Sequence, residues 1–310
     1  MAKVIAVCTS TVKGTCKEQV DSIKLIEDMG IEGDAHAGKW HRQVSLLALE
    51  KIDEFRAKGA NVDYGAFGEN IIVEGIDLRG LPVGTRLEIG DALLELTQIG
   101  KECHAHCAIY HQVGDCIMPR EGVFTVVLRG GEVKAGNEIK VIEVDPGRAY
   151  TAAVITLSDK GAAGEREDKS GPIIKNMLED AGYKITETLM IPDGREELTV
   201  QLKRLADQRQ VNLIITTGGT GLSPRDLTPE ATIDVCDRLA PGIAEAVRAY
   251  SMTKTPTAML SRAAAGMRGS TLIINLPGSP KAVTECMEFL IKPLEHGIET
   301  MLGRSGDCAR

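Results

Sequence analysis

The sequence is poor in aromatic residues, in long apolar runs and in positive charge. Phe, Trp and Tyr make up 3% of its 310 residues, so the hydrophobic cores must be built mostly from aliphatic side chains. No run approaches the roughly 18 apolar residues that a membrane-spanning helix needs. The stretch from Met1 to Val7 is too short for a signal peptide and turns polar too soon, and we expect it to form the first strand. These absences predict a cytoplasmic protein without a membrane partner.

The charge of the chain argues against nucleic acid as a partner. Residues 1–150 hold 17 basic and 23 acidic side chains, a net charge of −6, and the remaining residues hold 19 and 21, a net charge of −2. Neither part is basic enough for a nucleic acid or an anionic membrane. The eight cysteines are scattered without a dense framework, and in the cytoplasm we expect them as reduced thiols.

What the sequence does contain is a change of pattern near residues 143–148, where Pro-Gly with flanking charges is typical of a linker. We predict a domain over 1–145, a linker over 146–151, a second domain over 152–304 and a tail over 305–310. The first domain has many short apolar segments between glycine turns and one convincing helix, over 46–58. This pattern predicts a mostly β, barrel-like or sandwich domain. Its expected strands include residues 70–73, 86–89, 92–97, 123–128 and 138–144.

After the linker, predicted strands alternate with predicted helices. Alternation of this kind predicts an α/β domain with a doubly wound, mainly parallel sheet, in which ligands bind beyond the carboxyl ends of the strands. We expect strands over 152–157, 184–189, 212–217 and 271–276, and helices over 172–180, over 196–208 and from Pro280 onward.

The most informative segment is a glycine loop, Thr216 to Ala231. It follows a buried strand, and Thr228 as N-cap with Pro229 at the first helical position predicts a helix at its end. Glycines let backbone N–H groups approach an anion closely, and Asp226 could hold a magnesium ion beside it. The pattern predicts a phosphate site. The alternative is a tight turn without a ligand.

Three other predicted strands of this domain also end in polar or turn residues. Ser158 and Asp159 follow the first strand, Asp193 follows the second, and Pro277-Gly278-Ser279 follows the last. If the sheet is doubly wound, these ends can converge on the glycine loop. Asp193 and Asp226 would then suit magnesium-assisted handling of a nucleoside triphosphate. The alternatives are a turn aspartate at Asp193, an ordinary loop carboxylate at Asp159 and a simple helix start at Ser279.

A second group of candidates lies in the first domain, where thiols and imidazoles cluster. Cys103 and Cys107 flank two histidines, and Cys116 follows nearby. Such a cluster predicts either a zinc site or a thiol made reactive by a lowered pKa. Cys-x3-Cys without a second paired module is a weak zinc pattern, and Cys116 could equally be a packed apolar residue.

Residues 150 to about 304 resemble the molybdopterin adenylyltransferase family, the MogA/MoaB-like group. The resemblance implies the molybdopterin-binding fold, a homotrimer and a magnesium-dependent reaction. In that reaction the terminal phosphate of molybdopterin attacks the α-phosphate of ATP, giving adenylyl-molybdopterin and pyrophosphate. The matching stretches, whose order and spacing cover nearly the whole domain, are residues 156–159, 191–193, 217–231, 260–263, 266–269 and 276–280.

The resemblance also implies roles for individual residues. Asp193 and Asp226 occupy the family's two essential acidic positions and would hold Mg2+. Gly218 to Gly221 match the loop that binds the phosphates of the pterin and the nucleotide, and Ser158 and Asp159 match a nucleotide-side motif. The substrate-binding and nucleotide-binding residues expected from it are Ser158, Asp159, Thr217, Gly218, Gly219, Thr220, Gly221, Arg225, Ser261, Arg262, Pro277, Gly278 and Ser279.

Most of residues 1–144 resemble the MOSC domain, a β-rich module named for the C-terminus of molybdenum cofactor sulfurase. The resemblance implies binding or delivery of molybdenum cofactor or sulfur, with Cys103 as the best candidate thiol and Cys107 and Cys116 behind it. The matching stretches are residues 32–38, 42–47, 65–70, 81–85 and 103–124.

Three hypotheses follow from the two resemblances. In the first, the chain is an enzyme of molybdenum cofactor biosynthesis that adenylylates molybdopterin, and its MOSC-like half binds a later form of the cofactor. In the second, the chain is a carrier without turnover. In the third, the MOSC-like half is itself a reductase-like or sulfur-transfer unit. A molybdate insertase and molybdoenzymes are the protein partners that the first hypothesis implies.

Overall fold

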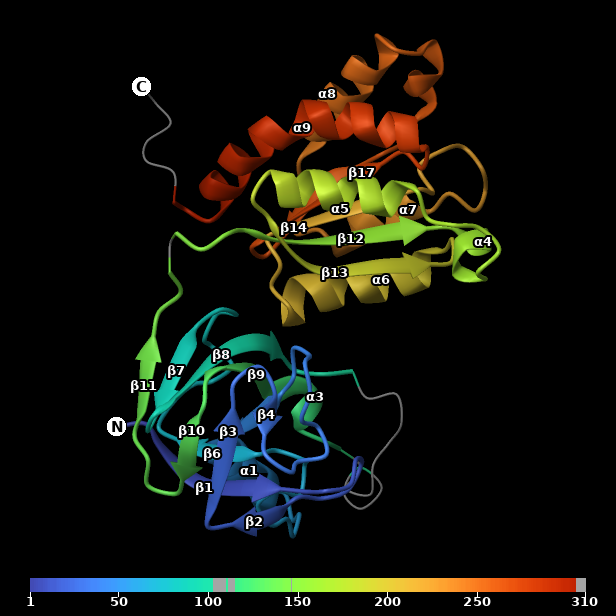
Figure 1. Ribbon diagram of the computed structural model, residues 1–310. Coiled ribbons are helices and arrows are strands. Elements are labelled where there is room, and N and C mark those ends of the chain that lie inside the picture. The colour runs from blue at the N-terminus through green and yellow to red at the C-terminus, as the bar shows by residue number, and fades with distance from the viewer. Residues whose placement is uncertain (103–109, 111–114, 146, 305–310) are drawn as a thin grey trace. The chain divides into compact units, whose positions relative to one another are not determined.

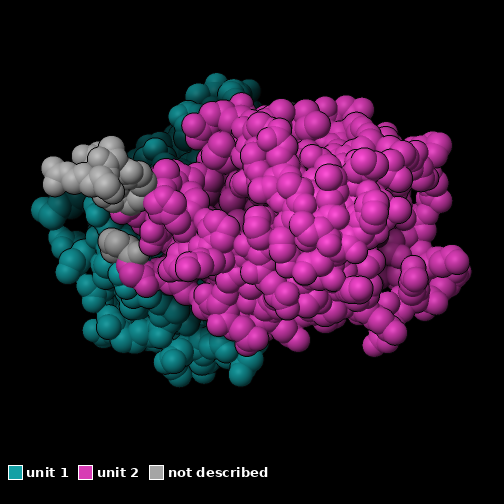
Figure 2. Space-filling view, turned by 90° about the horizontal axis from the view of Figure 1, so that it is seen from above, with its two compact units in different colours: residues 1–145 teal, residues 146–310 magenta. Residues whose placement is uncertain are grey.

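The computed structural model describes residues 1–102, 110, 115–145 and 147–304, so Cys103 and Cys107 lie outside the described residues. The chain divides into two compact units, Met1–Asp145 and Pro146–Arg310 (Figure 1 and Figure 2). Thr151, the last residue of the predicted linker, already belongs to a strand of the second unit.

The N-terminal unit consists mostly of strands, as predicted. Eight strands form one sheet in the order β11-β7-β8-β9-β5-β6-β1-β2, and three more form a small sheet in the order β10-β3-β4. Neighbouring strands are antiparallel except β5 and β6. The elements are β1 (Lys3–Thr9), β2 (Glu18–Val20), β3 (Ser22–Ile26), β4 (Gly30–Ile31), β5 (Val44–Ala48), α1 (Leu49–Ala57), β6 (Ile71–Glu74), β7 (Arg86–Ile89), β8 (Ala92–Ile99), α3 (Met118–Glu121), β9 (Val123–Arg129), β10 (Gly131–Lys134) and β11 (Ile139–Ile142).

Strand β11, at one end of the large sheet, contacts β1, the second strand from the other end. The amide of Val4 donates to the carbonyl of Asn137 at 2.9 Å, and the amide of Ile139 donates to the carbonyl of Ala2 at 2.9 Å. Side chains from the two faces of β1 enter different cores: Val4 and Val7 pack in one cluster, and Ala6 and Cys8 pack in another, against α1.

The predicted helix over 46–58 was wrong in its first turn. Residues 44–48 form strand β5, and the helix begins only at Leu49. These residues form a strand and not a helix because they have hydrogen-bonding partners on both edges: Leu46 to Ala48 pair with β6, and Val44 to Leu46 pair with β9. A short apolar run that is buried on both faces shows neither the alternation of a half-buried strand nor the 3.6-residue period of an amphipathic helix. Its sequence therefore does not distinguish a strand from a helix.

The C-terminal unit is α/β with a mixed sheet in the order β13-β12-β14-β17-β16-β15. The first four strands are parallel, as predicted, and the last two are antiparallel additions at one edge. The elements are β12 (Thr151–Leu157), α4 (Asp159–Ala162), α5 (Ser170–Asp180), β13 (Lys184–Ile191), α6 (Arg195–Lys203), η1 (Arg204–Gln208), β14 (Leu213–Thr217), α7 (Thr228–Val235), β15 (Arg238–Leu239), α8 (Pro241–Met252), η2 (Pro256–Leu260), β16 (Ala265–Arg268), β17 (Thr271–Leu276) and α9 (Pro280–Met301).

Helices cover both faces of this sheet, with α5 and α9 on one side and α6 on the other (Figure 1). Alternate residues of β12 point to opposite faces: Ala152 and Val154 join the core under α5 and α9, and Ala153 and Ile155 join the core under α6. The strand order changes direction at β12, which lies between β13 and β14. In open α/β sheets, ligands bind beyond the carboxyl ends of the strands at such a point.

Two of the predicted helix starts can be compared with the structure. Ser279 caps α9 as expected, since its Oγ accepts a hydrogen bond from the amide of Ala282 at 3.2 Å. Thr228 is not the N-cap of α7. Leu227 occupies that position, and the Thr228 hydroxyl instead donates to the carbonyl of Gly218 at 3.0 Å, because the loop folds back over the helix start.

None of the helices in the described ranges combines the length and the apolar character that crossing a membrane requires.

Candidate active site

A cavity of about 830 Å3 opens at the carboxyl ends of β12, β13, β14 and β17. The sheet places these ends side by side, since Thr156 pairs with Thr217 and Leu157 pairs with Ile191. We call it the first cavity. Its lining residues are Thr156, Leu157, Ser158, Gly161, Glu165, Arg166, Glu167, Asp168, Lys169, Ser170, Met190, Asp193, Thr217, Gly219, Asp226, Gly278, Ser279 and Pro280.

The glycine loop takes a shape that only glycine adopts easily. Gly218 has φ +103° and Gly219 has φ +61°, both in the left-handed region. A Cβ on Gly218 would lie 2.5 Å from the carbonyl oxygen of Leu157, and one on Gly219 would lie 2.3 Å from Oγ1 of Thr228. The loop therefore packs tightly against its own domain and brings the backbone of Gly219 to the first cavity.

Two carboxylates reach the first cavity, Asp193 from the segment after β13 and Asp226 from the segment after β14. Asp193 is held by a reciprocal pair of contacts: its Oδ2 accepts from the amide of Asp159 at 3.2 Å, and its own amide donates to Oδ1 of Asp159 at 3.0 Å. The Oδ2 atom of Asp226 accepts from the amide of Ser223 at 2.9 Å. Both side chains are only half-buried, and each keeps further oxygen lone pairs that a cation can use.

A second cavity of about 360 Å3 lies on the other side of the glycine loop. Thr220 and Gly221 line it, whereas Gly219 lines the first cavity, and Ser279 lines both. Small and apolar side chains from α8, η2 and the start of α9 form most of its wall. The remaining lining residues are Ala244, Val247, Arg248, Ser251, Thr255, Thr257, Ala258, Leu260, Ser261, Ala263, Pro277, Ala282 and Glu285.

The N-terminal unit has a smaller cavity of about 220 Å3 with a basic lining. Lys17, Arg42 and Lys101 line it, with no carboxylate among the described lining residues, and the guanidinium of Arg42 lies 4.9 Å from the ring centre of Trp40. The other lining residues are His36, Trp40, Ser45, Gly68, Asn70, Met118 and Phe124.

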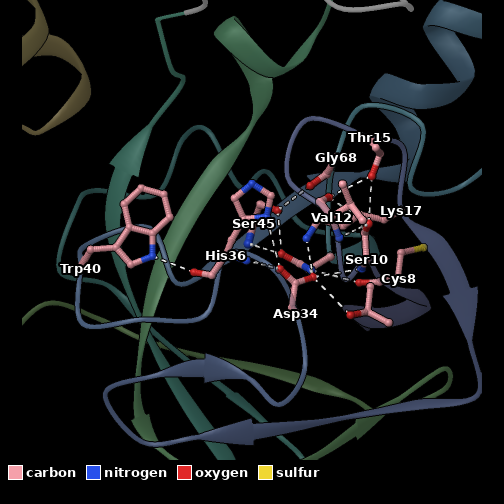
Figure 3. A network of polar contacts seen from close by, with 12 residues as sticks. Cys8, Ser10, Val12, Thr15, Lys17, Asp34, His36, Trp40, Ser45 and Gly68 are labelled. Atoms are coloured by element: carbon pink, nitrogen blue, oxygen red, sulfur yellow. Dashed lines mark hydrogen bonds and ion pairs between the residues drawn. The ribbon is translucent and has the colours of Figure 1, made fainter.

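A buried ion pair supports this N-terminal cavity (Figure 3). Nζ of Lys17 lies 2.5 Å from Oδ2 of Asp34, and both side chains are 2% exposed. Oδ2 of Asp34 also accepts from Nδ2 of Asn70 at 3.1 Å, and Oδ1 accepts from the amide of His36 at 2.8 Å. Burial alone would raise the pKa of Asp34, but the hydrogen bonds from His36 and Lys17 outweigh it and hold that pKa well below its usual range.

The pKa of a second buried carboxylate, Glu69, is shifted in the opposite direction from that of Asp34. Burial raises its pKa to about 7, against the opposing hydrogen bonds from the amides of Gly65 and Phe67. Burial also raises the pKa of the neighbouring Cys8 thiol to about 12, which makes that thiol a poor nucleophile.

Comparison with known proteins gives two family matches. Residues 153–296 match the family described as "Probable molybdopterin binding domain", and residues 33–140 match the MOSC domain. A molybdopterin adenylyltransferase of Helicobacter pylori (strain ATCC 700392 / 26695) is 40% identical over 152 residues, which span 48% of this chain and 86% of that protein. The molybdopterin adenylyltransferase of Escherichia coli K12 is 39% identical over 138 residues, which span 44% of this chain and 70% of that protein.

The chain belongs to the molybdopterin adenylyltransferase family.

The family match lies in the C-terminal unit, and the same segment recurs inside a larger protein. The molybdenum cofactor synthesis protein cinnamon of Drosophila melanogaster is 36% identical over 152 residues, 48% of this chain and 25% of that protein. A solved structure of the molybdopterin biosynthesis enzyme MoaB of Thermus thermophilus is 42% identical; the match covers 50% of this chain and 97% of that one, with a TM-score of 0.48.

In this member of the adenylyltransferase family, the predicted site residues fall into three groups. Ser158, Asp193, Thr217, Gly219, Asp226, Gly278 and Ser279 line the first cavity. Thr220, Gly221, Ser261 and Pro277 line the second, together with Ser279. Asp159, Gly218, Arg225 and Arg262 line neither of these two cavities.

Two arginines of the group that lines neither cavity bind the backbone and side chains around the site. Arg225 forms a direct ion pair with Oδ2 of Asp159, whose Oδ1 accepts from the amide of Asp193. Arg262 donates Nε to the carbonyl of Gly221 at 2.7 Å and its terminal nitrogens to the carbonyl of Asp226 and the carboxylate of Glu230. The contacts of Arg262 hold the glycine loop closed on its own domain.

Sequence reasoning missed Asp168, which lies in the polar loop before α5. Its Oδ2 accepts from the Thr156 hydroxyl at 2.7 Å, and its Oδ1 accepts from the amides of Ser170 and Gly171 at 3.0 and 2.9 Å. Asp168 precedes the N-cap residue Lys169, and its carboxylate binds the first amides of α5 and joins the helix to the end of β12. An aspartate shortly before the first helical residues, here in Asp-Lys-Ser-Gly-Pro, is a recognisable signal of a helix start.

The cysteine candidates receive little support from the described residues. Cys116 is buried, 7% exposed, in the apolar cluster with Ile117 and Met118. Cys103 and Cys107 lie outside the described residues, and Lys101 of the N-terminal cavity precedes Cys103 by two positions. Among the residues that can be described, no group of three or more His, Cys, Asp or Glu side chains is arranged to hold a metal ion.

Proposed function

We propose that the C-terminal unit transfers the adenylyl group of ATP to the terminal phosphate of molybdopterin and releases pyrophosphate. The observation that carries the proposal is the pair of cavities that meet at one glycine loop and share Ser279. A reaction between two bound substrates needs two such pockets with a common edge, because the reacting atoms must come within about 3.5 Å of each other.

The chemistry of each cavity favours one substrate. The first cavity is polar, and its size suits a nucleoside triphosphate. The second cavity is smaller and largely apolar, which suits a flat heterocycle such as the pterin. The glycine loop between them would then bind phosphate on both sides, with Gly219 facing the nucleotide and Gly221 facing the pterin phosphate.

In the reaction, an oxygen of the pterin's phosphate attacks the α-phosphorus of ATP. A new P–O–P linkage forms, and the bond from the α-phosphorus to the oxygen that bridges to the β-phosphate breaks. The electron pair of that bond leaves with pyrophosphate. A phosphate monoester is already largely a dianion near neutral pH, so the protein need not supply a base. The protein's work is to bring the two phosphates together and to stabilise their charge.

The first cavity fits a magnesium ion that arrives with ATP. Five carboxylates line it against two cationic side chains, Arg166 and Lys169, so a bare triphosphate would be repelled. Asp193 and Asp226 are the carboxylates that would hold Mg2+, which in nucleotide sites commonly takes one or two protein carboxylates and completes its shell with phosphate and water. When bound, the ion neutralises charge on the phosphates of ATP.

The test of this function is product analysis. The full chain, incubated with ATP, Mg2+ and molybdopterin, should form adenylyl-molybdopterin that is detectable by mass, in step with pyrophosphate. A carrier would bind molybdopterin tightly without forming either product. That outcome would support the second hypothesis.

A separate observation favours an anion-binding role for the N-terminal unit. Lys17 already pairs with Asp34, so Arg42 and Lys101 are the basic side chains that would attract the phosphate of a bound cofactor. The soft thiolate of Cys103 would suit a dithiolene-bound molybdenum centre. We propose that this MOSC unit binds molybdenum cofactor or carries sulfur to it. Arg42→Gln should weaken binding of the cofactor, and Cys103→Ala should abolish any sulfur transfer while adenylyl transfer continues. Unchanged binding and transfer in these variants would contradict the role.

We also propose that the chain works as a homotrimer and passes its product to a molybdate insertase and then to molybdoenzymes. The support for the trimer is what the family resemblance implies. The covalent link between two cofactor-related units would also raise the local concentration of product near the second site. The cytoplasmic location stays a prediction.

A further inference from the structure

Two charged side chains line the second cavity in the described part of the chain, Arg248 and Glu285. Arg248 binds the backbone of the cavity wall: its Nε donates to the carbonyl of Ser261 at 2.8 Å, and a terminal nitrogen donates to the carbonyl of Ala263 at 3.2 Å. Arg248 therefore holds the wall of the cavity. Glu285 is the negatively charged group that a ligand in this cavity would meet.

The carboxylate of Glu285 has little competition for its lone pairs. Its ion pair within the described residues is with Nζ of Lys281 at 4.0 Å, and the Lys281 side chain is 86% exposed. A pair with that geometry and exposure contributes little. Glu285 itself is 23% exposed, on the first turns of α9, so its carboxylate is partly shielded from water where it meets the cavity.

A half-shielded carboxylate in a largely apolar pocket selects a ligand with two adjacent N–H donors. It accepts two parallel hydrogen bonds from such an edge, and these charge-assisted bonds are about twice as strong as neutral ones. The pterin ring presents that edge, a ring N–H beside an exocyclic amino group. Adenine lacks it, since its corresponding edge pairs an amino donor with a ring acceptor.

We propose that Glu285 is the specificity-determining residue of the second cavity. Its carboxylate binds the N3–H and 2-amino group of the pterin and so keeps the adenine of ATP out of that cavity. This proposal rests on the assignment of molybdopterin as substrate. A ligand without both donors would leave the carboxylate partly desolvated and unpaired, and sites that lose such a bond reject the ligand strongly.

The test compares two fluorescent rings that differ at one position. Pterin carries a 2-amino group, and lumazine carries an oxygen there. We measure binding of each to the full chain by fluorescence titration, for wild type, Glu285→Gln and the control Glu288→Gln. Glu288 lies on the same helix and is exposed, outside the lining of the second cavity.

Wild type and Glu288→Gln should prefer pterin over lumazine by roughly tenfold or more, and Glu285→Gln should lose most of that preference. In turnover, Glu285→Gln should raise KM for molybdopterin and leave KM for ATP unchanged. No binding of pterin to wild type, no preference over lumazine, or an unaltered preference in Glu285→Gln would overturn the proposal. Because ring binding needs no turnover, a failure of adenylyl transfer would appear separately, in product analysis.

Discussion

At the scale of single residues, Gly219 shows how tightly the glycine loop packs against the start of α7. Gly219→Ala would place a methyl group 2.3 Å from Oγ1 of Thr228 and hold an alanine at φ +61°. Thr228 is buried and holds the carbonyl of Gly218, so it cannot move without shifting the loop. A loop shift of about 1 Å can reduce turnover on the order of a hundredfold, and we expect kcat/KM to fall by that order.

The control for this variant is Gly242→Ala. Gly242 lies in the first turn of α8 with open space around its Cβ position, and alanine favours a helix. This variant should keep full activity in the pyrophosphate assay. Equal activity of Gly219→Ala and wild type would show that the loop geometry does not matter to the reaction.

Glu69 gives a pH prediction for the N-terminal unit. Its pKa is raised to about 7 by burial, above the value near 4.5 of the unfolded chain, so the folded state binds more protons between these limits. Stability from this group is present below about pH 4.5 and is lost as pH rises through 7, by an amount on the order of 3 kcal/mol.

The measurement is urea unfolding followed by the fluorescence of Trp40, the one tryptophan of the chain. Between about pH 5 and pH 8 the free energy of unfolding of wild type should fall relative to that of Glu69→Gln. The amide is not ionised at either pH, so the difference between the two proteins isolates Glu69. A difference that stays constant with pH would mean that Glu69 titrates normally.

At the scale of elements, the segment between β14 and α7 depends on a clamp that reaches it from elsewhere. Arg262 bonds the carbonyls of Gly221 and Asp226 and pairs with Glu230. From these contacts we infer that Arg262 positions the loop. The pKa of Glu230 is lowered by its hydrogen bond from Arg262, in agreement with an ion pair at ordinary pH.

A double-mutant cycle tests this role of Arg262. Arg262→Gln and Glu230→Gln should each lower kcat/KM by roughly tenfold, and the double variant should lose little more than Arg262→Gln alone, because both changes release the same loop. The assay is pyrophosphate release at saturating ATP and varied molybdopterin. Additive losses would instead assign Arg262 a direct contact with substrate.

The glycine loop, the two acidic positions and the parallel strands could be predicted from the sequence because each is encoded by neighbouring residues. Asp193 lies just after β13 and Asp226 ends the glycine loop after β14, and both strands have readable apolar runs. The sheet topology brings both carboxylates to the first cavity. The clamp by Arg262 could not be predicted, since its partners lie 32 to 41 residues away and depend on the path of the chain. The strand at 44–48 was missed for a similar reason: its partners on both edges are remote in sequence.

At the scale of the whole molecule, two units of different architecture share one chain. The family match concerns the C-terminal unit, and the MOSC match concerns the N-terminal one. If the homotrimer holds, three chains of 33.3 kDa would weigh about 100 kDa, which light scattering after gel filtration would report. A mass of one chain at micromolar concentration would contradict it.

The central claim is that the C-terminal unit catalyses adenylyl transfer through its acidic pair, and one measurement tests it most directly. We would follow pyrophosphate release from ATP with Mg2+, with and without molybdopterin, for wild type and Asp226→Asn. Asparagine can keep the hydrogen bond from the amide of Ser223, so the loop should stay folded while the charge is lost. The account predicts release by wild type that needs both Mg2+ and molybdopterin, and a loss on the order of a hundredfold or more in Asp226→Asn, as expected for a group that stabilises transition-state charge. Full release by Asp226→Asn, or tight pterin binding by wild type without any release, would contradict it.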